Sequence, residues 1–182
     1  MAFAVSLLFD SATSDAISAR WKRLADAGLS NSMFDLGYRP HVTLAVYDDL
    51  AMDAAVAALD QVFDKLDQIA VTLTGFSTFG VGSGVCYAAL APSQDLMRLH
   101  TTIVGAISET CRPYYQRRGW TPHCTLATGM TDAEIGRASD LLKGEWRRLT
   151  GVFEAADLVE FVPVVGIKRW ILAPAPHSTR RP

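Results

Sequence analysis

A nine-residue segment that occurs twice in the chain, 82 positions apart, constrains the fold more than any other feature. Residues 37–45 read GYRPHVTLA and residues 119–127 read GWTPHCTLA, so six of the nine positions are identical. A seventh position exchanges one aromatic residue, Tyr38, for another, Trp120. In a chain of 182 residues, a repeat at this offset predicts two similar units of about 80 residues each.

The same offset brings the rest of the two units into register without a gap. Each strand-like or helical segment of the first unit falls on a similar segment of the second: 3–9 on 85–91, 14–27 on 96–109, 51–66 on 133–148 and 69–76 on 151–158. Each unit therefore reads as strand, helix, strand, helix and strand, with the repeated motif on its middle strand.

The remaining segments join or extend the two units. The glycine-rich stretch at residues 80–84 predicts a turn between them, which places the two lobes at about 3–80 and 84–173 of a single domain. Residues 164–172 predict one more strand, paired as a hairpin with residues 155–162 across Pro163. The polar end, residues 174–182, is predicted to be a frayed tail.

Each repeated motif presents a histidine and a threonine on one face of its strand. Side chains alternate between the faces of a strand, so His41 points the same way as Thr43, and His123 the same way as Thr125. If an approximate two-fold relates the units, these four polar groups converge on one space between the lobes. Core packing does not require such residues in both halves, because burying an imidazole and a hydroxyl is costly. We therefore interpret the pair as functional.

Two histidines and two threonines suit the cleavage of a phosphoester. The reaction needs one proton removed from the attacking oxygen and another delivered to the leaving oxygen, and histidine can do either near neutral pH. Threonine hydroxyls can donate hydrogen bonds to the nonbridging phosphate oxygens, where charge accumulates in the transition state. The sequence thus predicts His41 and His123 as the acid–base pair.

The tripeptide His-x-Thr is not specific by itself, because all four histidines of the chain have threonine two positions later. His100 lies in a predicted helix, where residues two apart do not share a face. His177 lies in the polar tail. Both are predicted to be structural or solvated, whereas only His41 and His123 follow a proline and precede an apolar strand.

These paired Pro-His-x-Thr-Leu motifs resemble those of the two-histidine (2H) phosphoesterase superfamily, in particular its bacterial 2′-5′ RNA ligase-like and cyclic phosphodiesterase branch. The resemblance implies an α+β fold: a bilobal, pseudo-two-fold duplicate with antiparallel sheets lining a central cleft and helices packed outside. It also implies chemistry without a metal, with His41 and His123 as acid and base and Thr43 and Thr125 binding phosphate. The motif does not distinguish the acid from the base.

Further candidates for substrate binding lie outside the two motifs. The family often carries Arg or Lys shortly before the second motif, a role that Arg117 or Arg118 could fill, since Thr121 stands at the place matching Arg39. The loop at residues 112–120 could stack a base on Tyr115, and Phe79 could do the same from the end of the first unit. The alternative is a solvated loop with packed aromatic side chains. Both interpretations remain open.

Composition excludes several other classes of function. The net charge of −2 and the 49% of hydrophobic residues fit a soluble globular protein without a basic excess. No phosphate-binding glycine loop or dinucleotide fingerprint is present, so we expect no cofactor. The three cysteines match no zinc pattern and we expect them to be reduced; Cys124 should point away from His123. With no signal peptide or membrane span, we expect a cytoplasmic monomer.

Three functions follow from these observations. The first is hydrolysis of 2′,3′-cyclic phosphates at RNA ends or on nucleotides to 2′-phosphates, together with a reversible 2′-5′ RNA ligase activity in which a 5′-hydroxyl replaces water as the nucleophile. The second keeps the chemistry but changes the substrate to 2′-5′-linked oligonucleotides or ADP-ribose cyclic phosphate. The third is a non-catalytic module that binds RNA ends in the same cleft.

Overall fold

The computed structural model describes residues 1–143, 146 and 148–175, and it confirms the predicted order of strands and helices. The elements are β1 (Ala2–Phe9), α1 (Ser11–Asp26), α2 (Ser32–Asp35), β2 (His41–Tyr47), α3 (Met52–Phe63), β3 (Ile69–Thr78), β4 (Cys86–Leu90), α4 (Gln94–Ala106), a 3₁₀ turn (Pro113–Tyr115), β5 (His123–Ala127), α5 (Asp132–Lys143), β6 (Leu149–Phe161) and β7 (Val165–Ile171). Only α2 and the 3₁₀ turn were not predicted, because they are too short to show a period. Most of the predicted tail, including His177, lies outside the described residues.

The strands form one antiparallel sheet in the order β2-β1-β6-β3-β4-β5, with β7 paired to β6. The last strand of each unit pairs with the first strand of the other, because β6 lies against β1 and β3 against β4. In the ladder between β3 and β6, Ala70 pairs with Val152, its own counterpart at the 82-residue offset. The pseudo-two-fold axis therefore passes through this ladder and joins the two expected sheets into one.

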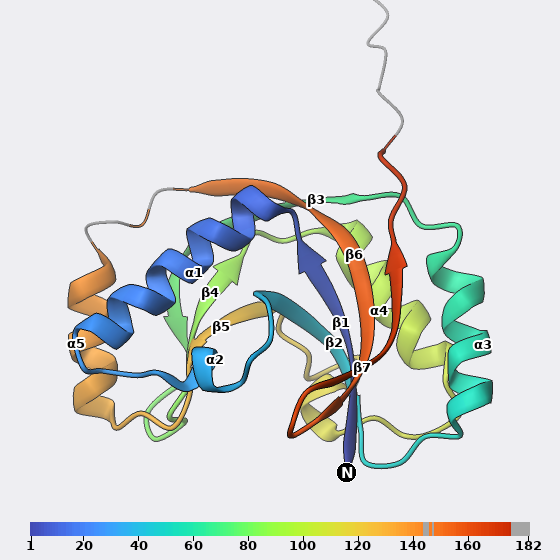
Figure 1. The fold of residues 1–182 in the computed structure, drawn as a ribbon, viewed down its shortest axis with the longest axis horizontal. Coiled ribbons are helices and arrows are strands. Elements are labelled where there is room, and N and C mark those ends of the chain that lie inside the picture. The colour runs from blue at the N-terminus through green and yellow to red at the C-terminus, as the bar shows by residue number, and fades with distance from the viewer. Residues whose placement is uncertain (144–145, 147, 176–182) are drawn as a thin grey trace, which may run out of the picture.

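The sheet is strongly curved and helices cover its flanks (Figure 1). Helices α1 and α5 lie on one side of the molecule, and α3 and α4 lie on the other. Strands β2 and β5, the two ends of the sheet, contact each other, with α1 against β5 and α4 against β2. These observations confirm the expected α+β duplicate. The lobe limits at 3–80 and 84–173 stay a prediction.

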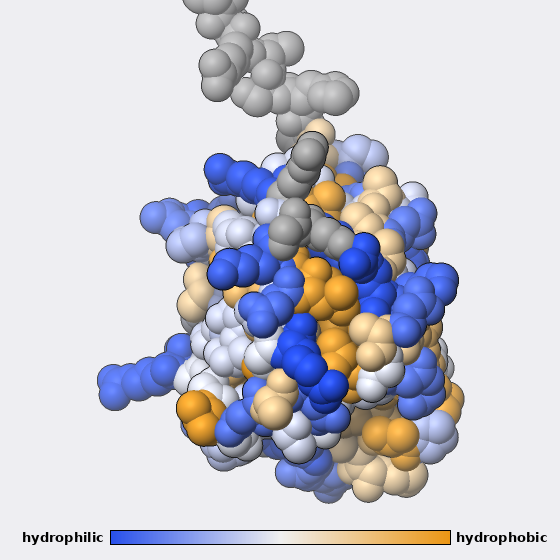
Figure 2. All heavy atoms as spheres, turned by 90° about the vertical axis from the view of Figure 1, so that its left-hand side faces the viewer, coloured by the Kyte–Doolittle hydropathy of each residue, from blue (hydrophilic) through white to orange (hydrophobic). Residues whose placement is uncertain are grey.

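Amphipathic patterning explains how α1 forms and packs. The helix begins where the Asp10 carboxylate accepts a hydrogen bond from the Thr13 amide at 2.9 Å, which caps the first turn. Ile17, Trp21 and Leu24 follow at helical spacing, and all three are buried in the main core. The outer face of this side of the molecule is mostly hydrophilic, with apolar groups showing between charged ones (Figure 2).

The turn predicted between the two units joins β3 to β4. Gly80, Gly82 and Gly84 all have positive φ angles, a backbone region that favours glycine. The predicted hairpin is also present, with Glu160 of β6 opposite Val165 of β7. Among the described residues, no helix has both the length and the apolar character needed to cross a bilayer.

Candidate active site

The two motif histidines sit at equivalent positions and are oriented in the same way. His41 is the first residue of β2 and His123 the first of β5. The Nδ1 atom of His41 lies 2.7 Å from the carbonyl oxygen of Arg39, and that of His123 lies 2.8 Å from the carbonyl oxygen of Thr121. Because a carbonyl only accepts, each Nδ1 carries the hydrogen in the neutral ring and each Nε2 is left as an acceptor. Both motifs thus hold the same tautomer.

Two indole groups connect the motifs across the molecule. The Nε1–H of Trp120, which precedes β5, donates to the carbonyl oxygen of Thr43 on β2 at 2.9 Å. The Nε1–H of Trp21, on α1, donates to the carbonyl oxygen of Thr125 on β5 at 3.1 Å. Each motif threonine is therefore held through its backbone by a tryptophan from the other unit. The Trp120 bond joins the segment before β5 to β2, and the Trp21 bond joins α1 to β5.

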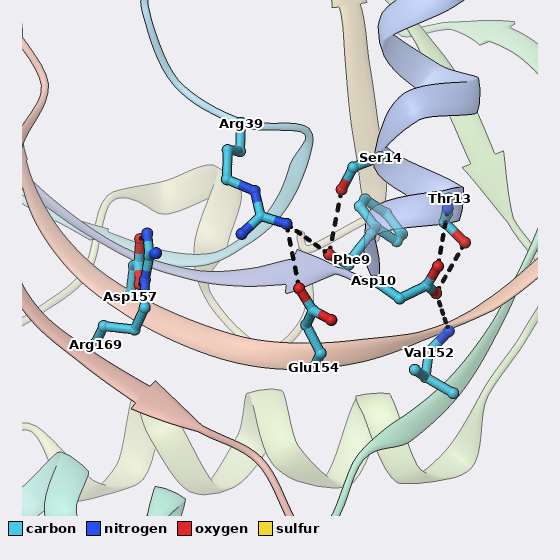
Figure 3. A network of polar contacts seen from close by, with 9 residues as sticks. All are labelled: Phe9, Asp10, Thr13, Ser14, Arg39, Val152, Glu154, Asp157 and Arg169. Carbon is cyan, nitrogen blue, oxygen red and sulfur yellow. Dashed lines mark hydrogen bonds and ion pairs between the residues drawn. The ribbon is translucent and has the colours of Figure 1, made fainter. Parts of the chain in front are cut away.

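A row of polar residues crosses four strands from the first motif. In the strand registers, Thr43 lies opposite Ser6, Ser6 opposite Asp157, and Asp157 opposite Arg169. Directly opposed residues share a face of the sheet, so this row extends from β2 to β7 on the face that carries His41. Asp157 is only 3% exposed and accepts two hydrogen bonds from the Arg169 guanidinium, each at 2.7 Å (Figure 3).

Tyr38 links that polar row to His41. Its ring centroid lies 4.6 Å from that of His41, and its hydroxyl donates to the Asp157 carboxylate at 3.1 Å. Burial, together with the nearby Asp157 charge, raises the pKa of Tyr38 far above its ordinary range, so the phenol stays protonated. The first histidine thus has a fixed aromatic neighbour that is itself anchored by a buried carboxylate.

His123 has a more apolar environment. Its ring makes edge contacts with Phe79, at a centroid distance of 4.8 Å, and with Tyr87 at 5.3 Å. The Phe79 and Tyr87 rings also contact each other at 4.5 Å. Phe79, one of the predicted substrate-binding residues, therefore lies beside a motif histidine, whereas Tyr87 was not predicted.

Burial sets the charge state of both imidazoles. Desolvation lowers the pKa of His41 to about 4, an effect increased by the charge of His123 and opposed by the hydrogen bond to Arg39 and by Asp157. Desolvation also lowers the pKa of His123. Both rings are thus neutral at pH 7 in the free protein. The buried Cys124 has a thiol pKa raised by desolvation to about 12, which argues against a nucleophilic thiol.

The two motifs differ in the ion pair that flanks the first one. The Arg39 guanidinium donates to the carbonyl oxygen of Phe9 and to the Glu154 carboxylate, both at 3.2 Å (Figure 3). The positions 82 residues from Arg39 and Glu154 are Thr121 and Thr72, so no such ion pair can form beside the second motif. This difference breaks the two-fold symmetry of the site.

The other predicted residues of the loop before β5 lie elsewhere. Arg117 donates to the carbonyl oxygen of Thr101 on α4 at 3.4 Å. Arg117 and Arg118 line a separate pocket together with Glu109. Tyr115 is partly buried against the core. Tyr115 also packs against the small cluster of Ala4, Val46 and Val159, as Tyr38 does.

His100 has a structural role, as predicted. It is fully buried, its ring stacks on Trp120 at a centroid distance of 4.0 Å, and its Nε2 lies 2.9 Å from the carbonyl oxygen of Tyr115. It therefore supports the indole that reaches Thr43. Within the described part of the chain, no three His, Cys, Asp or Glu side chains converge in a way that could hold a metal ion.

Several residues around the motifs were missed by sequence reasoning. Asp157 had a signal, because it is a charged residue within the apolar run of β6. The aromatic exchange of Tyr38 for Trp120 was visible in the repeat, but the different partners of these side chains were not. Trp21 had no signal, since its hydrogen bond spans 104 residues.

Comparison with known proteins gives a consistent result. The family model described as the 2′-5′ RNA ligase superfamily matches residues 13–162. A protein of Bacillus licheniformis whose name assigns it to the phosphoesterases is 28% identical over 129 residues, which is 67% of this chain and 74% of that one.

Two solved structures show a similar fold. TT0787 of Thermus thermophilus superposes with a TM-score of 0.64 at 15% identity, covering 97% of this chain and 100% of that one. E. coli LigT complexed with NADP+ superposes with a TM-score of 0.60 at 17% identity, covering 94% and 96%.

Proposed function

Because this chain belongs to the 2′-5′ RNA ligase superfamily of two-histidine phosphoesterases, we propose that it opens 2′,3′-cyclic phosphates on RNA ends or nucleotides to 2′-phosphates. The observation that supports this most is the matched pair of imidazoles. Each is held by Nδ1 with Nε2 left as the reacting atom, and each has a threonine on the same face of its strand. The two strands that carry them contact each other.

The proposed reaction is an in-line displacement at phosphorus. His41, with the pKa of about 4, is neutral and accepts a proton at Nε2 from the attacking water. The bond from phosphorus to the 3′-oxygen breaks as a new bond to the water oxygen forms. His123 delivers the proton from its Nε2 to the departing 3′-oxygen, after the anionic phosphate has raised the pKa of this ring on binding. Thr43 and Thr125 donate hydrogen bonds to the nonbridging oxygens.

The electrostatic difference between the two motifs supports this assignment of roles. Desolvation lowers the pKa of both rings, but a protonated His123 lowers the pKa of His41 further, so His41 is the ring that stays neutral and can accept a proton once bound phosphate has favoured protonation of His123. If activity instead required His123 to be deprotonated, His123 would be the base and His41 the acid. Ligation would follow the same path with a 5′-hydroxyl in place of the attacking water: the new bond joins phosphorus to the 5′-oxygen, the bond to the 3′-oxygen breaks, and a 2′-5′ linkage results.

The decisive experiment compares single histidine variants on adenosine 2′,3′-cyclic phosphate, with product identified by ³¹P NMR. His41→Ala and His123→Ala should each abolish turnover, while EDTA should leave the wild-type rate unchanged. The matched control is His177→Ala, which changes a histidine of the predicted tail and should retain full activity. Inhibition by EDTA, or turnover that survives both substitutions, contradicts the proposal.

A substrate panel separates the related activities. E. coli LigT has been solved with NADP+, 3′-AMP and ATP, which supports a nucleotide as the substrate here. Turnover of 2′-5′-linked dinucleotides or ADP-ribose cyclic phosphate above that of nucleoside cyclic phosphates would identify the second activity. Tight binding of RNA ends with no turnover at any pH would identify the non-catalytic binding module.

A further inference from the structure

A groove of about 1140 Å³ lies beside His123 and is not used by the proposed chemistry. Strand β4 forms its floor, the N-terminal half of α4 one wall, and residues 120–122 the other. The residues that characterise it are Tyr87, Leu90, Met97, Thr101, Thr121 and Pro122. We refer to it as the α4 groove.

The α4 groove is continuous with the second motif. Tyr87 lines the groove and its ring contacts the His123 ring at 5.3 Å. Thr121 also lines it, and the carbonyl of Thr121 accepts the hydrogen bond that orients His123. A molecule with its phosphate between the histidines can therefore extend into the groove without leaving the protein surface.

The equivalent place beside the first motif is bridged. There, Arg39 joins the end of β1 to β6 through the Phe9 carbonyl and the Glu154 carboxylate (Figure 3). With Thr121 and Thr72 at the matching positions, the second motif has no bridge and its groove stays open. The asymmetry gives the substrate one direction in which to extend, toward α4.

The lining of the α4 groove fits a nucleoside. Leu90, Pro122 and the 40% exposed Met97 offer apolar surface to the faces of a base. Gln94 and Arg98 stand on the α4 side, and the Arg98 guanidinium is held at 3.3 Å from the Gln94 amide oxygen. Apolar walls with a few polar groups are typical of pockets that bind a flat heterocycle.

We propose that the α4 groove is the subsite for the nucleoside whose cyclic phosphate lies between His41 and His123. This inference rests on the proposed function and specifies its substrate as a nucleoside or RNA-end phosphate rather than a small cyclic phosphate without a base. It also places the ribose, and with it the departing 3′-oxygen, on the His123 side.

The test measures substrate preference as a ratio: kcat/KM for adenosine 2′,3′-cyclic phosphate divided by kcat/KM for glycerol 1,2-cyclic phosphate, which lacks a base. Thr72→Glu/Thr121→Arg transplants the bridge of the first motif to the second and should lower the ratio at least tenfold. Met97→Ser, at a half-exposed position that tolerates a polar side chain, should lower it about threefold or more by removing apolar contact. The control is Ala106→Ser, an exposed position at the far end of the same helix, which should leave the ratio unchanged.

The outcomes separate the groove from the chemistry. If the wild-type protein turns over both substrates and all variants keep the wild-type ratio, the groove assignment is overturned while the proposed function stands. If the wild type turns over neither, binding of adenosine 2′-monophosphate is measured by calorimetry. Weaker binding by Met97→Ser, but not by Ala106→Ser, then supports the groove although the reaction is refuted. Equal binding by all proteins, or none, overturns the groove.

Discussion

Replacing Trp120 with phenylalanine tests whether the hydrogen bond from its indole to the Thr43 carbonyl helps to position the reacting groups. The Trp120 side chain is buried, lies flat on His100 and donates its Nε1–H to the carbonyl oxygen of Thr43 at 2.9 Å. Phenylalanine keeps an aromatic ring for the stack but has no donor. The substitution therefore removes the hydrogen bond with little change in the remaining contacts.

The expected loss of stability follows from the place of Thr43 in the sheet. β2 is an end strand, so no neighbouring strand can take over a carbonyl that points away from β1. An unsatisfied, partly buried carbonyl costs about 1–3 kcal/mol. For a chain of this length that corresponds to a fall in Tm of about 2–12 °C. The loss of a fixed position for the Thr43 hydroxyl should also lower kcat/KM by about 10- to 100-fold.

Trp170 provides a matched control. Its buried indole packs on Phe63 and donates to the Asp60 carboxylate at 2.7 Å, away from both motifs. Thermal unfolding and kcat/KM on adenosine 2′,3′-cyclic phosphate are measured for both variants. Trp170→Phe should lose stability and keep kcat/KM, Trp120→Phe should lose both, and Trp21→Phe should behave like Trp120→Phe. The reasoning is refuted if Trp120→Phe and Trp170→Phe lose equal stability and their kcat/KM values agree within twofold.

Three further predictions concern the charges of the site. The double variant His41→Ala/His123→Ala should be no less active than either single variant, because the two groups act as one unit; additive losses in a rate assay would contradict this. The folded-state pKa of His41, about 4, lies below the unfolded value of about 6.5, so the unfolded chain binds more protons between these values and stability falls as the pH falls through this window. Urea unfolding should show a loss of about 1–2 kcal/mol from this residue between pH 7 and pH 5, and His41→Gln should reduce the dependence of stability on pH. An unchanged dependence would refute the lowered pKa, because it would show that the ring takes up its proton over the same pH range in the folded and unfolded states. Arg169→Ala should lower the free energy of unfolding by about 1–3 kcal/mol in the same assay, because it leaves the buried Asp157 with only the Tyr38 hydroxyl. Arg169→Lys should restore only part of this loss. An alanine variant as stable as the wild type would refute the pairing as a source of stability.

The repeat explains why so much of the fold could be predicted. A segment such as residues 69–76 is ambiguous alone, but its match with residues 151–158 supports a strand in both places. The same comparison distinguished His41 and His123 from His100, whose burial in α4 agrees with its helical context. Local pattern and duplication were sufficient at this level.

What the sequence did not predict depends on contacts between distant segments. The pairing of β6 with β1, the reach of Trp21 to Thr125 and the pairing of Asp157 with Arg169 depend on how the sheet curves. The bridge formed by Arg39 illustrates the same point, because its partner Glu154 is 115 residues away. Spacing along the chain carries no information on such partners until the strand order is known.

The exchange of end strands between the two units has a consequence for how the molecule holds together. Each half contributes its final strand to the other's sheet, which is the arrangement of a domain-swapped dimer whose protomers have been fused into one polypeptide. A fragment that ends in the glycine turn would keep β3 but lack both of its partners, β4 and β6, and would leave β1 paired with β2 alone. Two such fragments, cut at that turn and mixed, should recover a folded complex that neither forms alone.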